Sequence, residues 1–339
     1  MASPQMPVRD MDSLKSALLD ETETEVRDQT FKNMPVANRL WAQKEPGSGG
    51  DDIHRWPVSA GLNPYAKMIQ SDADTVTWGA TQTVTTAWWD TMALFAVPVQ
   101  DSLIREAKLN GKAAIINLVE RELKQASMTL KRMISTQTFG DGTTPGTLIG
   151  LSGILPSTGV GSNTVYNIPE VSNRYWRNLY FNSVGSWPVH GLYGSTDDII
   201  TQAYLSGSDN GADTPNLCIT DISVAMAYSR AEGRTRQTTM RSEFAQIGRA
   251  GVTDGGNPGS WLPIYNAELV WDVQCPTGYM YMVHTEDFKL IEDPAFNMRW
   301  LGPFQLGNQP FLKGRVLTYR AQSEVYRRNW NVVLTGILP

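Results

Sequence analysis

The most regular pattern of apolar and polar positions lies between Asp101 and Gly153. Apolar residues recur there at steps of three and four: Ile115, Val119, Leu123, Ala126, Leu130 and Met133. This spacing places them on one face of an amphipathic helix. The pattern predicts a long helix that is interrupted at Asn110-Gly111, continues to about Gln137 and ends in a glycine-rich turn at 140–146. At about 1.5 Å per residue, the part after Gly111 is roughly 40 Å long, the width of a whole domain.

A second pattern precedes this helix. From Thr75 to Thr91 most residues are β-branched or aromatic, which favours extended strands. Apolar side chains do not gather on one face of the segment, and two strands alone cannot enclose a core. We therefore expect a long β ribbon that needs the domain body or a neighbouring molecule to cover it. Its tryptophans, Trp78, Trp88 and Trp89, are candidate contacts between subunits.

The first 33 residues are different again. Residues 10–28 carry seven carboxylates and two basic side chains, which gives a net charge of −5. Met11, Leu14 and Leu18 form a narrow apolar stripe that predicts a helical arm too small to fold alone. A solvated tail is one interpretation of this segment. The other, which we favour, is that the arm docks on a neighbouring subunit.

Basic side chains gather in two later segments and could form a solvated face, receive such an arm or face nucleic acid. The first segment contains Arg230, Arg234, Arg236, Arg241 and Arg249, and the second contains Lys313, Arg315, Arg320, Arg327 and Arg328. Complementary charges orient an assembling subunit more than they bind it. We therefore expect Glu21 and Glu23 of the arm to lie near Arg234 or Arg320.

The remaining pattern mixes short strands and helices. Residues 148–155 read as a strand, 170–182 as a short helix, and 195–205 as a helix with Ser195 and Asp198 as its capping signal. Asp221 is expected to cap a further helix that ends at Gly233. Further strands are predicted at 217–220, 268–271, 278–284 and 288–292, and two more within 314–338.

These elements predict an α+β fold with five parts. We divide the chain into an N-terminal arm (1–35), an extended β-hairpin loop region (36–100), a peripheral domain with the long helix (101–194), an axial α/β domain (195–300), and closing strands that return to the peripheral domain (301–339). No repeat of 20–50 residues is visible.

Composition and charge exclude several function classes. The chain has 339 residues, 41% of them hydrophobic, which suffices for a large core, and its net charge of −5 argues against a dedicated nucleic-acid binder. The count of eleven tryptophans favours a protein with buried interfaces between subunits. We expect no membrane span and no secretory signal. The two cysteines, Cys218 and Cys275, are expected to be free thiols.

No segment of the sequence contains a convincing catalytic or ligand-binding motif. The histidines His54, His190 and His284 are isolated in sequence and lack metal-ligand spacing. The 140–147 loop lacks the Lys-Ser/Thr pair of a phosphate loop, and 209–213 lacks the spaced carboxylates of a calcium loop. Ser152 lacks the strand–turn–helix context of a nucleophile. We therefore expect no catalytic residue, no metal and no cofactor.

The order of elements resembles the major capsid protein of tailed bacteriophages, the Hong Kong 97-type fold. An acidic arm, a long ribbon, a long helix, an α/β region and closing strands correspond to the N-arm, E-loop, spine helix, and peripheral and axial domains. The resemblance covers roughly 34–339. The resemblance rests most specifically on five short segments: Asn110-Gly111-Lys112-Ala113-Ala114-Ile115, Gly140-Asp141-Gly142-Thr143, Gly150-Leu151, Tyr175-Trp176-Arg177-Asn178 and Pro276-Thr277-Gly278-Tyr279 before Leu290.

The resemblance implies a structural protein, not an enzyme. Such subunits form hexamers and pentamers of an icosahedral head shell that encloses double-stranded DNA, which they contact without sequence specificity. Portal, scaffolding and decoration proteins are the implied partners, and the virion, assembled in the bacterial cytoplasm, is the implied location. An encapsulin-like compartment, an α/β hydrolase, and a phage tail or decoration protein are the alternatives. We expect Gly111 to act as a joint that lets identical subunits adopt different curvatures.

Overall fold

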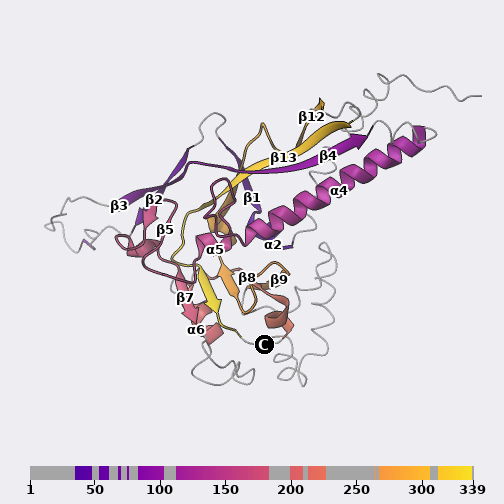
Figure 1. Cartoon of the computed structure of the whole chain (residues 1–339). Helices are drawn as coiled ribbons and strands as arrows, with labels where there is room; N and C mark the ends of the chain where they lie inside the picture. The colour runs from indigo at the N-terminus through magenta and orange to yellow at the C-terminus, as the bar shows by residue number, and fades with distance from the viewer. Residues whose placement is uncertain are drawn as a thin grey trace, which may run out of the picture.

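The computed structural model describes eleven parts of the chain: residues 35–47, 53–60, 68–69, 75, 83–102, 112–182, 199–208, 213–226, 264, 267–305 and 312–337. Within them the chain forms two five-stranded sheets, a long helix and a projecting hairpin (Figure 1). The predicted N-terminal arm, Trp78, Gly111 and Arg234 lie outside the described residues.

The first sheet, the long sheet, is built around one strand. It contains β1 (Gln43–Pro46), β11 (Phe288–Glu292), β13 (Leu312–Val325), β12 (Arg299–Gln305) and β4 (Ala93–Ser102). β13 pairs antiparallel with β11, β12 and β4, so it is hydrogen-bonded to every other strand of the sheet except β1, which pairs with β11. In β4 the side chains alternate strictly, with Phe95 and Val97 buried and Leu94 exposed. This two-residue period places one face of the strand on the core.

Helix α4 (Lys112–Thr138) lies along β4, and both project from the body towards the same side (Figure 1). It confirms the predicted long helix after Gly111. Leu123, Ala126 and Leu130 are buried, as the stripe predicts, but Met133 is 38% exposed and Ile134 is buried in its place. A step of four from Leu130 keeps closer to the buried face than a step of three, because the helix advances about 100° per residue.

The glycines after α4 allow a close approach of backbone to backbone. A Cβ at Gly150 would meet the carbonyl oxygens of Gln137 and Thr138 at the end of the helix, and one at Gly153 would meet that of Asp141. The turn predicted at 140–146 is confirmed. The strand predicted at 148–155 is wrong, because Leu151–Ile154 is a short helix, α5, held in this tight contact.

In the second sheet, the short sheet, the three central strands are buried on both faces and the two edge strands only in part. Its order is β7 (Leu179–Asn182), β14 (Val332–Thr335), β10 (Met280–Val283), β8 (Leu217–Thr220) and β9 (Glu268–Trp271). Along β10, Tyr281 and Val283 belong to the large core shared with the long sheet, whereas Met280 and Met282 belong to a smaller core with helix α6 (Ile199–Ser206). Burial on both faces explains why these strands are continuous apolar runs.

Each sheet contains strands from more than one of the five expected parts of the chain, and the boundaries between those parts stay predictions. β7, expected with the long helix, and β14, expected to return to the peripheral part, both lie in the short sheet. β11, expected in the axial part, lies in the long sheet. Strand partners far apart in sequence decide this membership, so the chain crosses between the sheets several times.

The hairpin is formed by β2 (His54–Ala60) and β3 (Thr83–Trp89), which pair antiparallel over their whole length. It projects from the body on the side opposite to the free end of α4 (Figure 1). Two paired strands of two residues each, β5 (Thr164–Val165) and β6 (Ile168–Pro169), lie near the base of the hairpin. The extended segment expected before the long helix is therefore confirmed from Thr83 onward, and residues 76–82 lie outside the described residues.

Other short elements fill the remaining positions. The helix expected at 170–182 is mostly wrong: it is a three-residue 3₁₀ helix, η1 (Arg174–Trp176), followed by strand β7. Parallel pairing with β14 decides the conformation of that strand. The cap at Asp221 is confirmed, since its Oδ1 accepts the Val224 amide at 3.0 Å. Helix α2 (Pro35–Leu40) precedes β1, and η2 (Thr285–Asp287) links β10 to β11.

Candidate functional site

The hairpin base is fastened to the body by aromatic and polar side chains. His54 Nε2 lies 2.9 Å from Glu324 Oε2, and the His54 ring stacks on Trp89 with centroids 5.1 Å apart. Trp56 Nε1 donates to the carbonyl of Val325 at 3.1 Å. Glu324 lies on β13 of the long sheet, so these contacts fix the direction in which the hairpin leaves the body.

The structure separates the two described tryptophans of the predicted contact set. Trp89 is 5% exposed and packs inside the subunit. Trp88, on the opposite face of β3, is only half-buried, and its backbone amide donates to Tyr166 O at 3.2 Å. Trp88 therefore has side-chain surface left for a neighbour, whereas Trp89 contributes to the fold of its own chain.

The second basic segment is not a solvated basic face. Arg320 pairs with Asp293 at 3.0 Å, so an acidic arm would compete with a partner that is already present. Arg327 Nε donates to Asp287 Oδ1 at 2.6 Å. Burial raises the pKa of Asp287, although the hydrogen bond from Arg327 opposes that rise. The sequence showed one acidic neighbour for this cluster, because the other carboxylates come from distant segments.

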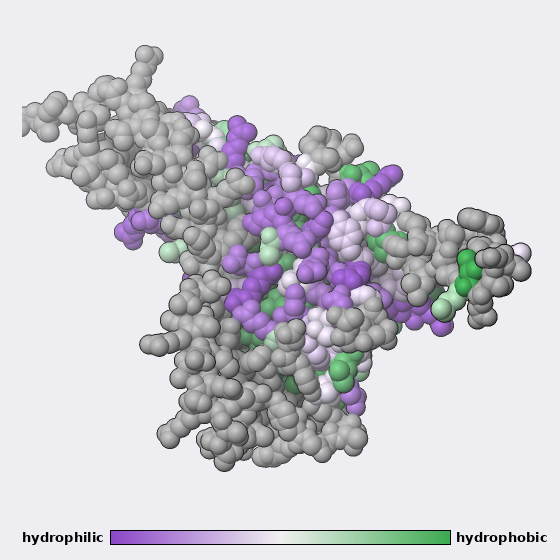
Figure 2. All heavy atoms as spheres, turned by 180° about the vertical axis from the view of Figure 1, so that it is seen from behind, coloured by the Kyte–Doolittle hydropathy of each residue, from purple (hydrophilic) through white to green (hydrophobic). Residues whose placement is uncertain are grey.

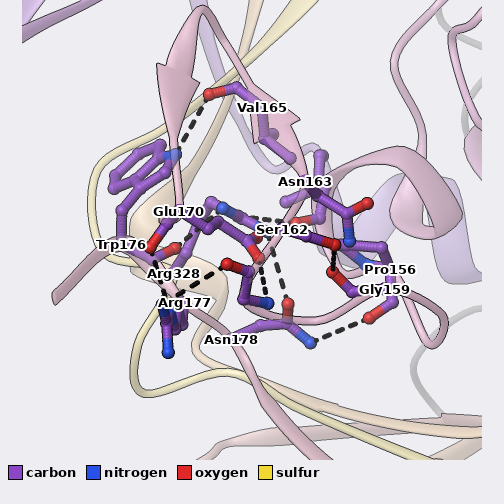
Figure 3. Close-up of polar contacts among 12 residues, drawn as sticks. Pro156, Gly159, Ser162, Asn163, Val165, Glu170, Trp176, Arg177, Asn178 and Arg328 are labelled. Carbon is purple, nitrogen blue, oxygen red and sulfur yellow. Dashed lines mark hydrogen bonds and ion pairs between the residues drawn. The ribbon is translucent and has the colours of Figure 1, made fainter. Parts of the chain in front are cut away.

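The burial of Arg328 differs more than any other feature of this segment from what the sequence predicts. Its side chain and that of Glu170 are both 0% exposed, and Arg328 Nη2 donates to Glu170 Oε1 at 2.9 Å (Figure 3). Arg328 also donates to the carbonyls of Ile154 at 2.6 Å and Trp176 at 2.7 Å. Burial lowers the pKa of its guanidinium, and the pairing with Glu170 opposes this fall.

This buried group joins segments that the sequence separates widely. Arg328 comes from the turn between β13 and β14, where the chain passes from the long sheet to the short sheet. Glu170 Oε2 also accepts the backbone amide of Gly161 at 2.7 Å, and its backbone carbonyl accepts Arg177 Nε at 3.0 Å (Figure 3). The cluster therefore holds the 154–178 region against the crossing between the sheets. No sequence signal distinguished Arg328 from Arg327 beside it.

The residues tested for catalysis have other contacts. His54 belongs to the hairpin base, and His284 Nε2 lies 2.9 Å from the carbonyl oxygen of Gly207. Ser152 Oγ lies 3.3 Å from the hydroxyl of Tyr281. Burial raises the pKa of this phenol, so it stays protonated and does not accept a proton from Ser152. His190 lies outside the described residues.

Cysteines and acidic side chains give no reactive or metal-binding group in the described part of the chain. Cys218 and Cys275 are free, as expected, and both are buried. Burial raises the pKa of Cys218 to about 12, and it also raises the pKa of Cys275. Neither thiol is therefore activated. No group of three or more His, Cys, Asp or Glu among the described residues could hold a metal ion.

The described surface carries two kinds of region. From the side shown in Figure 2, its side chains are mainly hydrophilic, and the hydrophobic ones are scattered. An open groove of about 360 Å³ lies between β4 and α4. Leu94, Phe95 and Met133 contribute apolar lining, and Arg132 contributes a cation. Among the described helices, none has the length and apolar character that a membrane span requires.

A projecting hairpin, a domain-long helix beside a long sheet, and a second sheet with buried central strands are the features expected of the Hong Kong 97-type capsid fold. Solved capsid structures share this arrangement. The Cyanophage A-1(L) capsid asymmetric unit is 12% identical, with a TM-score of 0.65 over 90% of this chain and 93% of that chain. The fold and the mixed helix and sheet architecture expected from the sequence are confirmed.

Two further capsids give the same result. The capsid of Myoviridae Phage XM1 is 11% identical, with a TM-score of 0.56 over 90% of this chain and 92% of that chain. The capsid of an empty GTA particle is 12% identical, with a TM-score of 0.57 over 88% of this chain and 89% of that chain. No family model and no curated protein matches the sequence. The likeness is therefore one of fold, across nearly the full length of each chain.

Proposed function

We propose that this chain is a major capsid protein, the subunit of a tailed-phage head shell. The observation that carries the proposal is the extent of the likeness: about nine-tenths of this chain and of each capsid chain superpose. The described residues add no catalytic constellation or metal group to that fold. A subunit of this kind does its work through its surfaces.

The subunit would assemble into hexamers and pentamers of an icosahedral shell. Different patches meet in a ring of identical subunits, and a projecting element on one copy must find a receiving surface on the next. The hairpin with Trp88 suits the projecting role. The buried Arg328–Glu170 pair supports a rigid subunit, which leaves curvature to joints such as Gly111.

The enclosed material would be double-stranded DNA, contacted through its phosphates without sequence specificity. The net charge of −5 fits a subunit that contacts DNA locally and does not bind it as its main task. We extend the proposal to portal, scaffolding and decoration proteins as partners. Assembly in the bacterial cytoplasm and residence in the virion complete it.

Electron microscopy of the purified recombinant protein tests the assembly. We expect closed shells, or hexamers and pentamers that close when concentration or salt is changed. A stable monomer under all conditions, as measured by light scattering, would contradict the proposal. The nucleic acid in particles made during infection separates a DNA-filled head from a compartment of the same fold that holds protein.

A further inference from the structure

Four ionisable side chains meet where the chain passes between the two sheets. His284 and Asp287 lie on the connection from β10 to β11, and Arg327 lies on the turn from β13 to β14. The carbonyl oxygen of Asp287 accepts the Tyr326 amide at 3.1 Å, which holds these two connections side by side. Asp213, from the segment between α6 and β8, contacts both His284 and Arg327. We refer to these four ionisable side chains as the junction cluster.

Both ring nitrogens of His284 face an acceptor. Nε2 lies 2.9 Å from the carbonyl oxygen of Gly207, just after α6, and Nδ1 lies 3.4 Å from Asp213 Oδ1. A carbonyl oxygen only accepts, so Nε2 must carry a hydrogen. In a neutral ring Nδ1 would then turn a lone pair towards a carboxylate, whereas in an imidazolium it carries a second N–H. The side chain of His284 is 4% exposed, so water has little access to either nitrogen.

The charges of the junction cluster balance only with that second proton. Arg327 Nε lies 2.6 Å from Asp287 Oδ1 and its Nη1 lies 3.2 Å from Asp213 Oδ2, so two carboxylates and one guanidinium sum to −1. Asp287 Oδ2 is buried without a hydrogen-bond partner in the described part of the chain. A buried charge that lacks a counter-charge is costly. A protonated His284 supplies the missing positive charge and makes the cluster neutral.

The remaining contacts of His284 in the described structure are with uncharged groups. Asn331 Oδ1 accepts its backbone amide at 2.9 Å, and the centroid of the Trp330 ring lies 6.2 Å from that of the imidazole. Glu286, the other carboxylate of η2, is exposed. The protonation of His284 therefore depends chiefly on the other three members of the junction cluster.

We propose that His284 is a pH-dependent fastener of the junction between the two sheets. With its second proton the ring binds both Gly207 and Asp213, and so holds the end of α6 and the segment before β8 against the two connections. Without that proton, Nδ1 and the Asp213 carboxylate repel each other and the attachment of this segment weakens. The proposal goes beyond the shell function and does not rest on it.

The sign of the pH effect follows from the separation of the four groups in the unfolded chain. The folded state holds the extra proton more tightly than the unfolded state, so stability falls as pH rises. Burial raises the pKa of Asp287, although Arg327 opposes that rise, and this contribution has the same sign. Histidine ordinarily titrates near pH ~6.5, so measurements between about pH 6 and pH 9 cover the loss of its proton.

Urea unfolding of the purified subunit over this pH range tests the proposal. We expect the midpoint of the wild type to fall, by about 0.4 M for a tenfold difference in proton affinity between the two states. Asp213→Asn offers an amide that donates to a neutral Nδ1, so most of this fall should be lost. Asp213 is 43% exposed, so the variant should fold. An equal fall in the wild type and the variant, or no fall in the wild type, overturns the proposal.

Asp293→Asn is the matched control. Asp293 pairs with Arg320 at 3.0 Å in the long sheet and does not belong to the junction cluster. This variant should lower the urea midpoint by a similar amount at every pH and keep the fall of the wild type. Loss of the fall in Asp293→Asn as well would show a general charge effect and would overturn the proposal.

Nitrogen-15 NMR of histidine-labelled protein locates the proton. The chain has three histidines, and His284→Gln assigns one signal by removing it. We expect both ring nitrogens of His284 to be protonated at about pH 6 and only one at about pH 9, with the change where the urea midpoint falls. A ring that stays neutral or stays charged throughout overturns the proposal. Neither measurement requires a shell, so failure here leaves the capsid function standing.

Discussion

Arg328→Ala removes the cation from an ion pair in which both side chains are fully buried. The arginine donates to Glu170, to Asn178 Oδ1 at 3.3 Å, and to the carbonyls of Ile154 and Trp176. All four acceptors stay in place in the variant. The carboxylate of Glu170 keeps the Gly161 amide at 2.7 Å but loses its buried counter-charge.

The expected loss of stability follows from this unpaired charge. Removing one partner of a buried ion pair costs about 3–5 kcal/mol, because the remaining ion is left without compensation in a medium of low polarity. A domain is stabilised by only about 5–15 kcal/mol in total. Arg328→Ala should therefore remove about a fifth or more of the free energy of unfolding.

Urea unfolding of the purified subunit, followed by tryptophan fluorescence, measures the change. Trp176 is a suitable reporter, since the Arg328 guanidinium lies 5.3 Å from its ring centroid. Arg320→Ala is the matched control, because its pair with Asp293 is partly exposed and should be worth about 1 kcal/mol or less. Equal losses in the two variants would refute the role of burial.

A double-mutant cycle checks the physical cause. Glu170→Ala leaves the arginine unpaired in the same way that Arg328→Ala leaves the glutamate. The double variant removes both charges and should lose less than the sum of the two single losses. Strict additivity would show that the pair is not coupled and that the stability comes from the backbone hydrogen bonds of Arg328.

Four other perturbations test separate parts of the structure. Burial raises the pKa of Asp272, so the folded state binds its proton more tightly and stability falls as pH rises through that pKa. Asp272→Asn should flatten the fall in urea midpoints that occurs as the pH is raised above the ordinary pKa of an aspartate. Gly153→Ala forces a Cβ onto a backbone carbonyl and should lower the free energy of unfolding by about 1–3 kcal/mol in the same assay. Trp88→Ala should reduce shell yield in light scattering while the subunit stays folded, whereas Trp89→Ala should destabilise the subunit. Gly111→Ala should stabilise the subunit by up to about 1 kcal/mol and shift particles towards aberrant sizes in micrographs.

The sequence alone determined the elements whose signal is local. Helix α4 follows from a three- and four-residue period sustained over many turns, and its end follows from the glycines after Thr138. The Asp221 cap and the short apolar strands were also predictable, because a capping residue and a continuous apolar run are both local features of the sequence. The order of these elements was enough to suggest the capsid fold.

The tertiary structure decided what depends on distant partners. A run such as 148–155 fits a strand or a helix, and contact with the end of α4 selected the helix. Strand membership in the two sheets was set by pairing across most of the chain, which no local pattern encodes. Arg327 and Arg328 are adjacent and chemically identical, yet one is partly exposed and the other is fully buried. Burial depends on what packs around a side chain, so only the folded chain could distinguish the two.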